Sequence, residues 1–340
     1  MLNILESPPA GLLDAEAVGL LELLGGPTLL HLPGRSPEPL FVSVLLHGNE
    51  DTGFYAVREL LRRYHGKTLP RAMSIFIGNV RAAAAGLRRL EGQPDYNRVW
   101  PGSDMPTTPE HELMARIVAE MERRQVFASV DVHNNTGINP HYGCVNRIDH
   151  RYLHLATLFS RTVVYFTRPR GVQSLAFSRL CPAVTVECGK PGQPHGIRHA
   201  CDYLEACLHV TDLPIHPVAP HDIDLFHTVA IVKVPESVSF SFGELPGDIR
   251  FLSELDHLNF RELAAGTQLG WVDGASIPRL EAWDETGRDV SERYFTIEAG
   301  RLCLRRSVMP SMFTLDSQVI RQDCLGYLME RYELIDTEAE

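Results

Sequence analysis

Apolar runs of strand length alternate with segments of helical periodicity across roughly the first two-thirds of this 340-residue chain. A helix between two strands carries the chain back to the edge where it started, so such strands can pair in parallel. We therefore predict an α/β fold with a mixed, mostly parallel sheet flanked by helices. The expected strands are 40–46, 73–77, 128–132, 162–166 and 183–186, and the expected helices are 11–24, 56–64, 111–124, 152–161, 174–180 and 196–210.

A proline-spaced stretch at residues 213–220 cannot continue the preceding helix and is typical of a linker. Beyond it the pattern changes to short strands separated by turns. The expected strands are 228–234, 266–272, 294–297 and 301–305, and the expected turns are Pro246-Gly247, Asp273-Gly274 and Ala299-Gly300. The sequence thus predicts an α/β domain over residues 1–212, N-terminal helix included, and a smaller β-rich domain over residues 213–340.

Charge and cysteine usage argue against several classes of protein. The formal charge of −11 would repel a phosphate backbone, so nucleic acid is not an expected partner. The seven cysteines form no CxxC pair, which favours reduced thiols over a disulfide framework or a zinc ribbon. The chain contains neither a secretory signal pattern at its start nor an apolar run of about 18 residues, so we expect a cytoplasmic protein that does not bind membranes.

Chemically reactive residues gather where three of the expected strands end. His47 and Glu50 follow the first strand, His133 follows the strand at 128–132, and Glu187 closes the strand at 183–186. Two imidazoles and a carboxylate would hold zinc while leaving a fourth position open for water, as in catalytic zinc sites. A partly desolvated Glu187 would then suit a general base. Each segment alone is a weak signal, and together they predict a mononuclear zinc hydrolase.

Nearby residues favour an anionic substrate. Arg81 follows the expected strand at 73–77, and Asn97 and Arg98 lie on an irregular segment between two Pro/Gly turns. An arginine can bind a carboxylate with two hydrogen bonds, and an arginine close to zinc can stabilise an oxyanion. Arg88 and Arg89 are interpreted instead as a solvated helix face. Asp131 shares a strand face with His133 and is either a carboxylate that orients it or an exposed strand-end acid.

These segments resemble, in order, the motifs of the succinylglutamate desuccinylase/aspartoacylase family, which has a zinc-carboxypeptidase-like fold. The similarity rests on five segments: His47-Gly48-Asn49-Glu50-Asp51-Thr52-Gly53, Asn79-Val80-Arg81-Ala82, Asp95-Tyr96-Asn97-Arg98, Asp131-Val132-His133-Asn134 and Val186-Glu187-Cys188-Gly189. A further stretch, residues 255–263 followed by Gly266-Thr267, resembles the family's C-terminal β segment, so the similarity extends over roughly residues 40–275.

The resemblance implies a zinc-dependent hydrolase, with one zinc ion per chain, that cleaves the amide bond of a small anionic N-acyl amino acid. It implies that His47, Glu50 and His133 bind zinc and that Glu187 activates water. It further implies that Arg81 stabilises the oxyanion and that Asn97 and Arg98 bind the substrate carboxylate. A homo-oligomer is compatible with this assignment.

The chain departs from the family pattern at one specificity position. Gln173 precedes Ser174-Leu175-Ala176 where aspartoacylase-type members have an arginine, and Arg170 is the candidate to replace it in substrate binding. Tyr294 is a candidate counterpart of a C-terminal tyrosine of the family, although a core aromatic is the favoured interpretation. Two alternatives remain open: a zinc carboxypeptidase that acts on short peptides and a catalytically inactive metal-binding protein.

Overall fold

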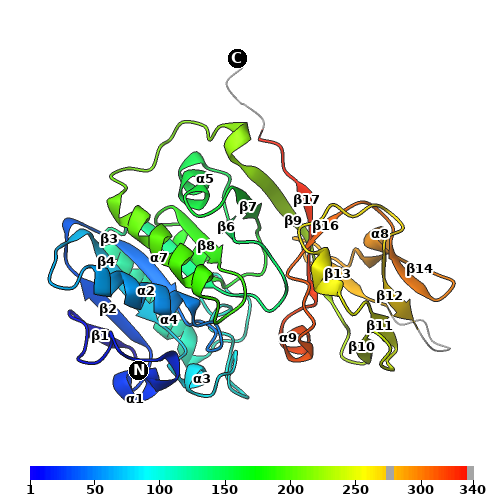
Figure 1. Ribbon diagram of the computed structural model, residues 1–340, viewed down its shortest axis with the longest axis horizontal. Coiled ribbons are helices and arrows are strands. Elements are labelled where there is room, and N and C mark those ends of the chain that lie inside the picture. Colours follow the sequence, from blue (N-terminus) through cyan, green and yellow to red (C-terminus); the bar gives the residue numbers. More distant parts are fainter. Residues whose placement is uncertain (273–278, 335–340) are drawn as a thin grey trace. The chain divides into compact units, whose positions relative to one another are not determined.

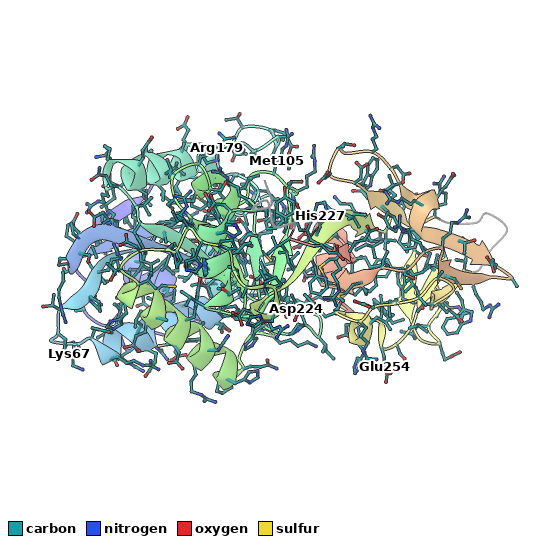
Figure 2. All side chains as sticks on the ribbon, turned by 90° about the horizontal axis from the view of Figure 1, so that it is seen from above. Lys67, Met105, Arg179, Asp224, His227 and Glu254 are labelled. Atoms are coloured by element: carbon teal, nitrogen blue, oxygen red, sulfur yellow. The ribbon has the colours of Figure 1, made fainter. Side chains whose placement is uncertain are left out.

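The computed structural model describes residues 1–272 and 279–334, and the chain divides into two compact units (Figure 1). The first unit contains residues 1–134 and 141–224, and the second contains residues 135–140 and 225–340. Asp224 and His227, both labelled in Figure 2, lie on either side of this boundary in the sequence. The proline-spaced stretch at 213–220, expected to be the linker, is thus part of the first unit.

The first unit is built on a mixed, mostly parallel sheet, as predicted. Its strands β3, β5 and β8 are adjacent and parallel. β5, β8 and the second half of β3 (39–44) are buried on both faces, which explains their nearly continuous apolar sequences. The strand order is β1-β2-β4-β3-β5-β8-β6-β7. The bounds are β1 Asn3–Leu5, β2 Thr28–Leu32, β3 Gly34–Val44, β4 Leu69–Ile77, β5 Ala128–His133, β6 Tyr142–Val145, β7 Thr162–Tyr165 and β8 Ala183–Glu187.

Helices cover both faces of this sheet. Helices α2 and α7 lie side by side over one face in Figure 1, and Figure 2, viewed from above, shows α4 on the opposite side. Helix α4 starts at a capping box formed by Thr108 and His111, with Pro109 as its first residue. The bounds are α1 Leu20–Leu24, α2 Thr52–Arg63, α3 Val80–Ala84, α4 Pro109–Arg123, α5 His150–Thr157, α6 Gln173–Phe177 and α7 Pro194–His209.

The N-terminal helix predicted over residues 11–24 is wrong. The structure has a 3₁₀ turn at Ala17–Gly19 followed by the single-turn helix α1. Gly11 adopts a φ of +88°, and Glu16 is extended, so a helix cannot run through these positions. The leucines still face inward, because Leu12, Leu20 and Leu24 are all buried.

The second unit is β-rich, as predicted. One sheet has the order β10-β11-β12-β15-β14, and a second group has the order β9-β17-β16 with β13 paired to β9. The bounds are β9 Asp224–Lys233, β10 Phe240–Phe242, β11 Ile249–Phe251, β12 Gln268–Val272, β13 Glu281–Trp283, α8 Ser291–Tyr294, β14 Phe295–Glu298, β15 Arg301–Leu304, β16 Met309–Ser311, α9 Ser317–Gln322 and β17 Gly326–Arg331. The expected turn at Asp273-Gly274 lies outside the described residues.

Phe251, Phe313 and Tyr294 are fully buried in the core of the second unit. Tyr294 is therefore the core aromatic that the sequence favours. Among the described residues, no helix combines the length and the apolar character required to cross a bilayer.

The short segment 135–140 joins the second unit although both of its neighbours in sequence belong to the first. Asn259 donates to the carbonyl of Ile138 (3.2 Å) and bonds both the N–H and the carbonyl of Phe313. The hydroxyl oxygens of Thr136 and Thr314 lie 2.7 Å apart. Gly137 packs so tightly that an added Cβ would lie 2.0 Å from the Phe313 carbonyl oxygen.

Candidate metal centre

The reactive residues meet because three neighbouring parallel strands end at the same edge of the sheet. His47 lies just beyond β3, His133 is the last residue of β5, and Glu187 is the last residue of β8. His133 and Glu187 are register partners, so their side chains emerge side by side on one face. Functional residues commonly gather at such carboxyl ends of strands.

The three predicted metal ligands converge on one point. Glu50 accepts hydrogen bonds from both imidazoles: Nδ1 of His47 lies 2.7 Å from Oε1, and Nδ1 of His133 lies 2.7 Å from Oε2. All three side chains are buried, and one ligand atom from each lies within 4.8 Å of the others. Residues separated by more than 80 positions in the sequence thus form one compact donor set.

The far nitrogen of each imidazole also faces a carboxylate. Nε2 of His47 lies 3.0 Å from Asp95 Oδ1, and Nε2 of His133 lies 2.8 Å from Asp131 Oδ2. Asp131 is fully buried and also accepts from the Ser43 hydroxyl at 2.6 Å, so it is not an exposed strand-end acid. Sequence reasoning gave no such role to Asp95, although it stands at the start of a quoted motif.

These carboxylates control the charge of the cluster. Burial and the Arg88 charge lower the pKa of His47, but Glu50 and Asp95 outweigh them and the pKa is raised. Burial lowers the pKa of His133, whereas Asp131 and Glu50 raise it well above its usual value. Burial raises the pKa of Glu50, but the two imidazoles lower it more strongly, and its pKa lies far below the ordinary range.

This donor set fits zinc. Two imidazole nitrogens and a carboxylate oxygen are typical of catalytic zinc sites. Metal-binding histidines usually donate their second N–H to a carboxylate, which fixes the tautomer, and Asp95 and Asp131 are placed to accept those bonds.

Arg88 bonds two carboxylates of the cluster. Its guanidinium donates to Glu50 Oε1 (3.3 Å) and to Asp95 Oδ2 (3.2 Å). Its interpretation as a solvated helix face is wrong, because α3 ends at Ala84 and the chain then turns through Gly86 at a φ of +65°. The carbonyl of Arg88 accepts from Gly48 N–H (3.0 Å), which ties it to the metal loop. Arg81 lies exposed on α3.

Asn97 and Arg98 lie next to the cluster. The Asn97 side chain is buried, with Nδ2 at 3.1 Å from His133 Nε2 and Oδ1 accepting from Gln173 N–H (2.9 Å). Arg98 is half-buried, and its charge helps to hold the pKa of Asp95 well below its usual value, although burial acts in the opposite direction and His47 and Arg88 lower it more.

Gln173 is an internal residue. Its side chain is 0% exposed, and its Nε2 donates to the Ser129 hydroxyl at 2.6 Å. As placed, it cannot contact a substrate. Arg170 is exposed, and the next residue, Gly171, packs against the backbone of Arg98 so closely that an added Cβ would lie 2.3 Å from its carbonyl oxygen. A role of Arg170 in substrate binding stays a prediction.

Glu187 is buried at the end of β8, between register partners His133 on β5 and Tyr142 on β6. Burial and the charges of Glu187 and Glu50 raise the pKa of the following residue, Cys188, well above its usual value. The role of Glu187 as a general base stays a prediction.

Comparison with known proteins agrees with this site. Residues 39–198 match the family model of the succinylglutamate desuccinylase/aspartoacylase catalytic domain, within which all the motifs quoted above lie. No curated protein sequence matches the chain.

Several solved structures share the fold. The succinylglutamate desuccinylase from Chromobacterium violaceum has 18% identity and a TM-score of 0.54 over 88% of this chain and 86% of that one. A succinylglutamate desuccinylase/aspartoacylase from Rhodobacter sphaeroides has 16% identity and a TM-score of 0.59 over 90% and 88%. Murine aminoacylase 3 has 16% identity and a TM-score of 0.56 over 88% and 96%. At these identities the likeness concerns the fold alone.

Proposed function

We propose that this protein belongs to the succinylglutamate desuccinylase/aspartoacylase family and is a zinc-dependent cytoplasmic hydrolase that cleaves the amide bond of a small N-acyl amino acid. One observation carries the proposal. The Glu50 carboxylate lies between the Nδ1 atoms of His47 and His133, and Glu187 ends the adjacent strand beside His133. This arrangement supplies three ligands and a separate carboxylate that can act as a base.

His47, Glu50 and His133 would hold one zinc ion per chain. When bound, zinc would polarise the amide carbonyl and make a water molecule more acidic. Asp95 and Asp131 each face the Nε2 atom of one imidazole, so Nδ1 would be the nitrogen that each histidine offers to the ion. Glu187 takes the proton from the attacking water and then donates it to the leaving amine.

Arg88, rather than Arg81, is the residue that we propose to stabilise the oxyanion of the tetrahedral intermediate. Its guanidinium bonds the proposed metal ligand Glu50, and the Arg88 side chain is only 12% exposed. A cation that is largely shielded from solvent interacts strongly with the negative charge that develops in the transition state. Asn97 and Arg98 are proposed to bind the substrate carboxylate, with Arg170 as a further contact.

A hydrolysis screen tests this function. Zinc-loaded protein is incubated with N-acetyl, N-succinyl and N-formyl amino acids and with tetrapeptides, and release of the free amine is measured. We expect turnover of at least one N-acyl amino acid and none of the tetrapeptides. Turnover of tetrapeptides would favour a carboxypeptidase, and no turnover of any compound by protein with bound zinc would support a catalytically inactive metal-binding protein.

The Glu187→Gln variant tests the proposed base. It should bind zinc with unchanged stoichiometry but lower kcat by roughly 10²–10⁴-fold, the usual contribution of general acid–base catalysis. Glu122→Gln, an exposed change on α4, serves as the matched control. A kcat of Glu187→Gln close to that of the control would remove Glu187 from this role.

A further inference from the structure

Asn134, the residue after the ligand His133, is buried and joins three parts of the site. Its backbone N–H donates to Glu50 Oε2 at 3.0 Å. Its side-chain Oδ1 accepts from Thr52 N–H at 3.2 Å, and its Nδ2 donates to the Gly189 carbonyl at 2.8 Å. One asparagine thus bonds the metal-ligand loop, the start of α2 and the turn that follows Glu187.

The contact with Thr52 replaces a missing helix cap. Helix α2 begins at Thr52, and the residue at its N-cap position, Asp51, makes no side-chain capping bond. The first N–H groups of a helix need acceptors from outside the helix, and Asn134 supplies one of them. Because α2 starts two residues after Glu50, this bond also fixes the end of the loop that carries His47 and Glu50.

The contact with Gly189 holds the other side of the site. The ladder of β8 ends at Glu187, and beyond it the backbone bond from Cys188 N–H to the His133 carbonyl (2.9 Å) continues the pairing with β5. Gly189 then bends the chain at a φ of +71°. The Asn134 amide is bonded to the carbonyl at this bend, so it restrains the direction in which the chain leaves Glu187.

We propose that Asn134 is a positioning residue that sets the place of the Glu187 carboxylate relative to the metal ligands. This inference rests on the proposed function, in which Glu187 must reach the attacking water. The side chain acts through hydrogen bonds to Thr52 and Gly189 and does not contact the substrate. Removing the side chain keeps the bond from the Asn134 backbone N–H to the ligand Glu50 but loosens the turn at residues 188–192.

The test compares Asn134→Ala with Asn146→Ala. Asn146 is also a buried asparagine of the first unit, and its Nδ2 donates to the Phe166 carbonyl at 3.0 Å, so the control removes the same type of bond. Asn134→Ala should retain zinc stoichiometry, lower kcat by about 10–100-fold and change KM by less than about 3-fold. Asn146→Ala should leave kcat within about 2-fold of wild type.

A double-mutant cycle identifies the group through which Asn134 acts. If it positions Glu187, adding Asn134→Ala to Glu187→Gln should cost less than about 3-fold in single-turnover rate, because the carboxylate it places is already gone. An additional loss as large as in the wild-type background would overturn the proposal. So would a loss of kcat that excess zinc restores, since Asn134 would then support the ligands alone.

Amide hydrogen exchange supplies a readout that does not depend on turnover. In Asn134→Ala, but not in Asn146→Ala, residues 188–193 should exchange at least about 10-fold faster. Unchanged exchange would contradict the proposed restraint. If the wild-type protein hydrolyses no N-acyl amino acid, the proposed function fails, while the exchange result still decides whether Asn134 holds the turn.

Discussion

Arg81 and Arg88 show how far the sequence alone can predict which individual residues lie at the site. Both precede the segment that carries Asp95 and Asn97, and the motif resemblance selects Arg81 because it stands in the segment Asn79-Val80-Arg81-Ala82. The structure leaves Arg81 exposed and brings Arg88 to Glu50 and Asp95. The turn at Gly86, which redirects the chain, is the signal that the helical interpretation of Arg88 overlooked.

The two arginines therefore give a discriminating pair of variants. Arg88→Gln should lower kcat by about 10²-fold or more, because a buried cation near the oxyanion is lost. Arg81→Gln should stay within about 2-fold of wild type, as expected for an exposed side chain. Steady-state kinetics on zinc-loaded protein, with bound zinc measured in each sample, checks this. If Arg81→Gln lowers kcat more than Arg88→Gln does, the oxyanion role returns to Arg81, as the motif resemblance implies.

The two ligand histidines also predict how zinc affinity depends on pH. Their pKa values are raised, and zinc requires neutral imidazoles. Zinc must therefore displace protons, and its affinity should fall as the pH falls, with up to about a 100-fold loss per pH unit if both imidazoles titrate. Competition with a chelator, corrected for the protonation of the chelator, measures this slope.

Asp95→Asn is the matched variant for that measurement. It removes a charge that raises the pKa of His47, so the dependence on pH should become shallower. An affinity that is independent of pH in the wild-type protein would contradict the prediction.

At the scale of elements, the strands that bear the site were the most predictable. β5 and β8 begin where expected and extend one residue further, to His133 and Glu187, because strands covered on both faces have continuous apolar sequences. The prediction of a helix at 11–24 was wrong because the spacing of leucines is equally compatible with short turns joined by extended residues such as Glu16. The bonds of Asp95 and Arg88 could not be predicted, since they join irregular segments whose path depends on tertiary packing.

Gly48 illustrates such a packing constraint. The sequence suggests that it permits a sharp turn, but the structure gives a different reason: an added Cβ would lie 2.2 Å from the Ala83 nitrogen of α3. Gly48→Ala should lower the free energy of unfolding by about 1–3 kcal/mol and weaken zinc binding, because the loop must move away from α3. Gly19→Ala, where a Cβ meets nothing within 4 Å, is the control. Denaturant unfolding and zinc titration report the two effects, and equal stability of the two variants would refute the packing argument.

At the scale of the whole molecule, the segment 135–140 belongs to the second unit although it lies between two parts of the first unit in the sequence. A protein ending at Asp224 would contain every candidate site residue but would leave residues 135–140 without Asn259, Phe313 and Thr314. We expect it to unfold at a lower temperature than the full chain and to bind zinc more weakly, because His133 lies only two residues before the orphaned segment. Asn259→Ala in the full chain should reproduce part of this loss. A truncated protein with the zinc affinity of the full chain would show that the segment is not needed.

Because of this chain order, residues 135–140 are synthesised well before the residues that they contact. The segment 135–140 leaves the ribosome long before its partner Phe313, which lies 173 residues after Pro140 (313 minus 140). At about 5–20 residues per second, that interval is roughly 9–35 seconds. During this interval, the segment that follows His133 cannot contact Phe313 or Thr314, because these residues have not yet been synthesised. The segment 135–140 can therefore make its hydrogen bond to Thr314 only near the end of translation.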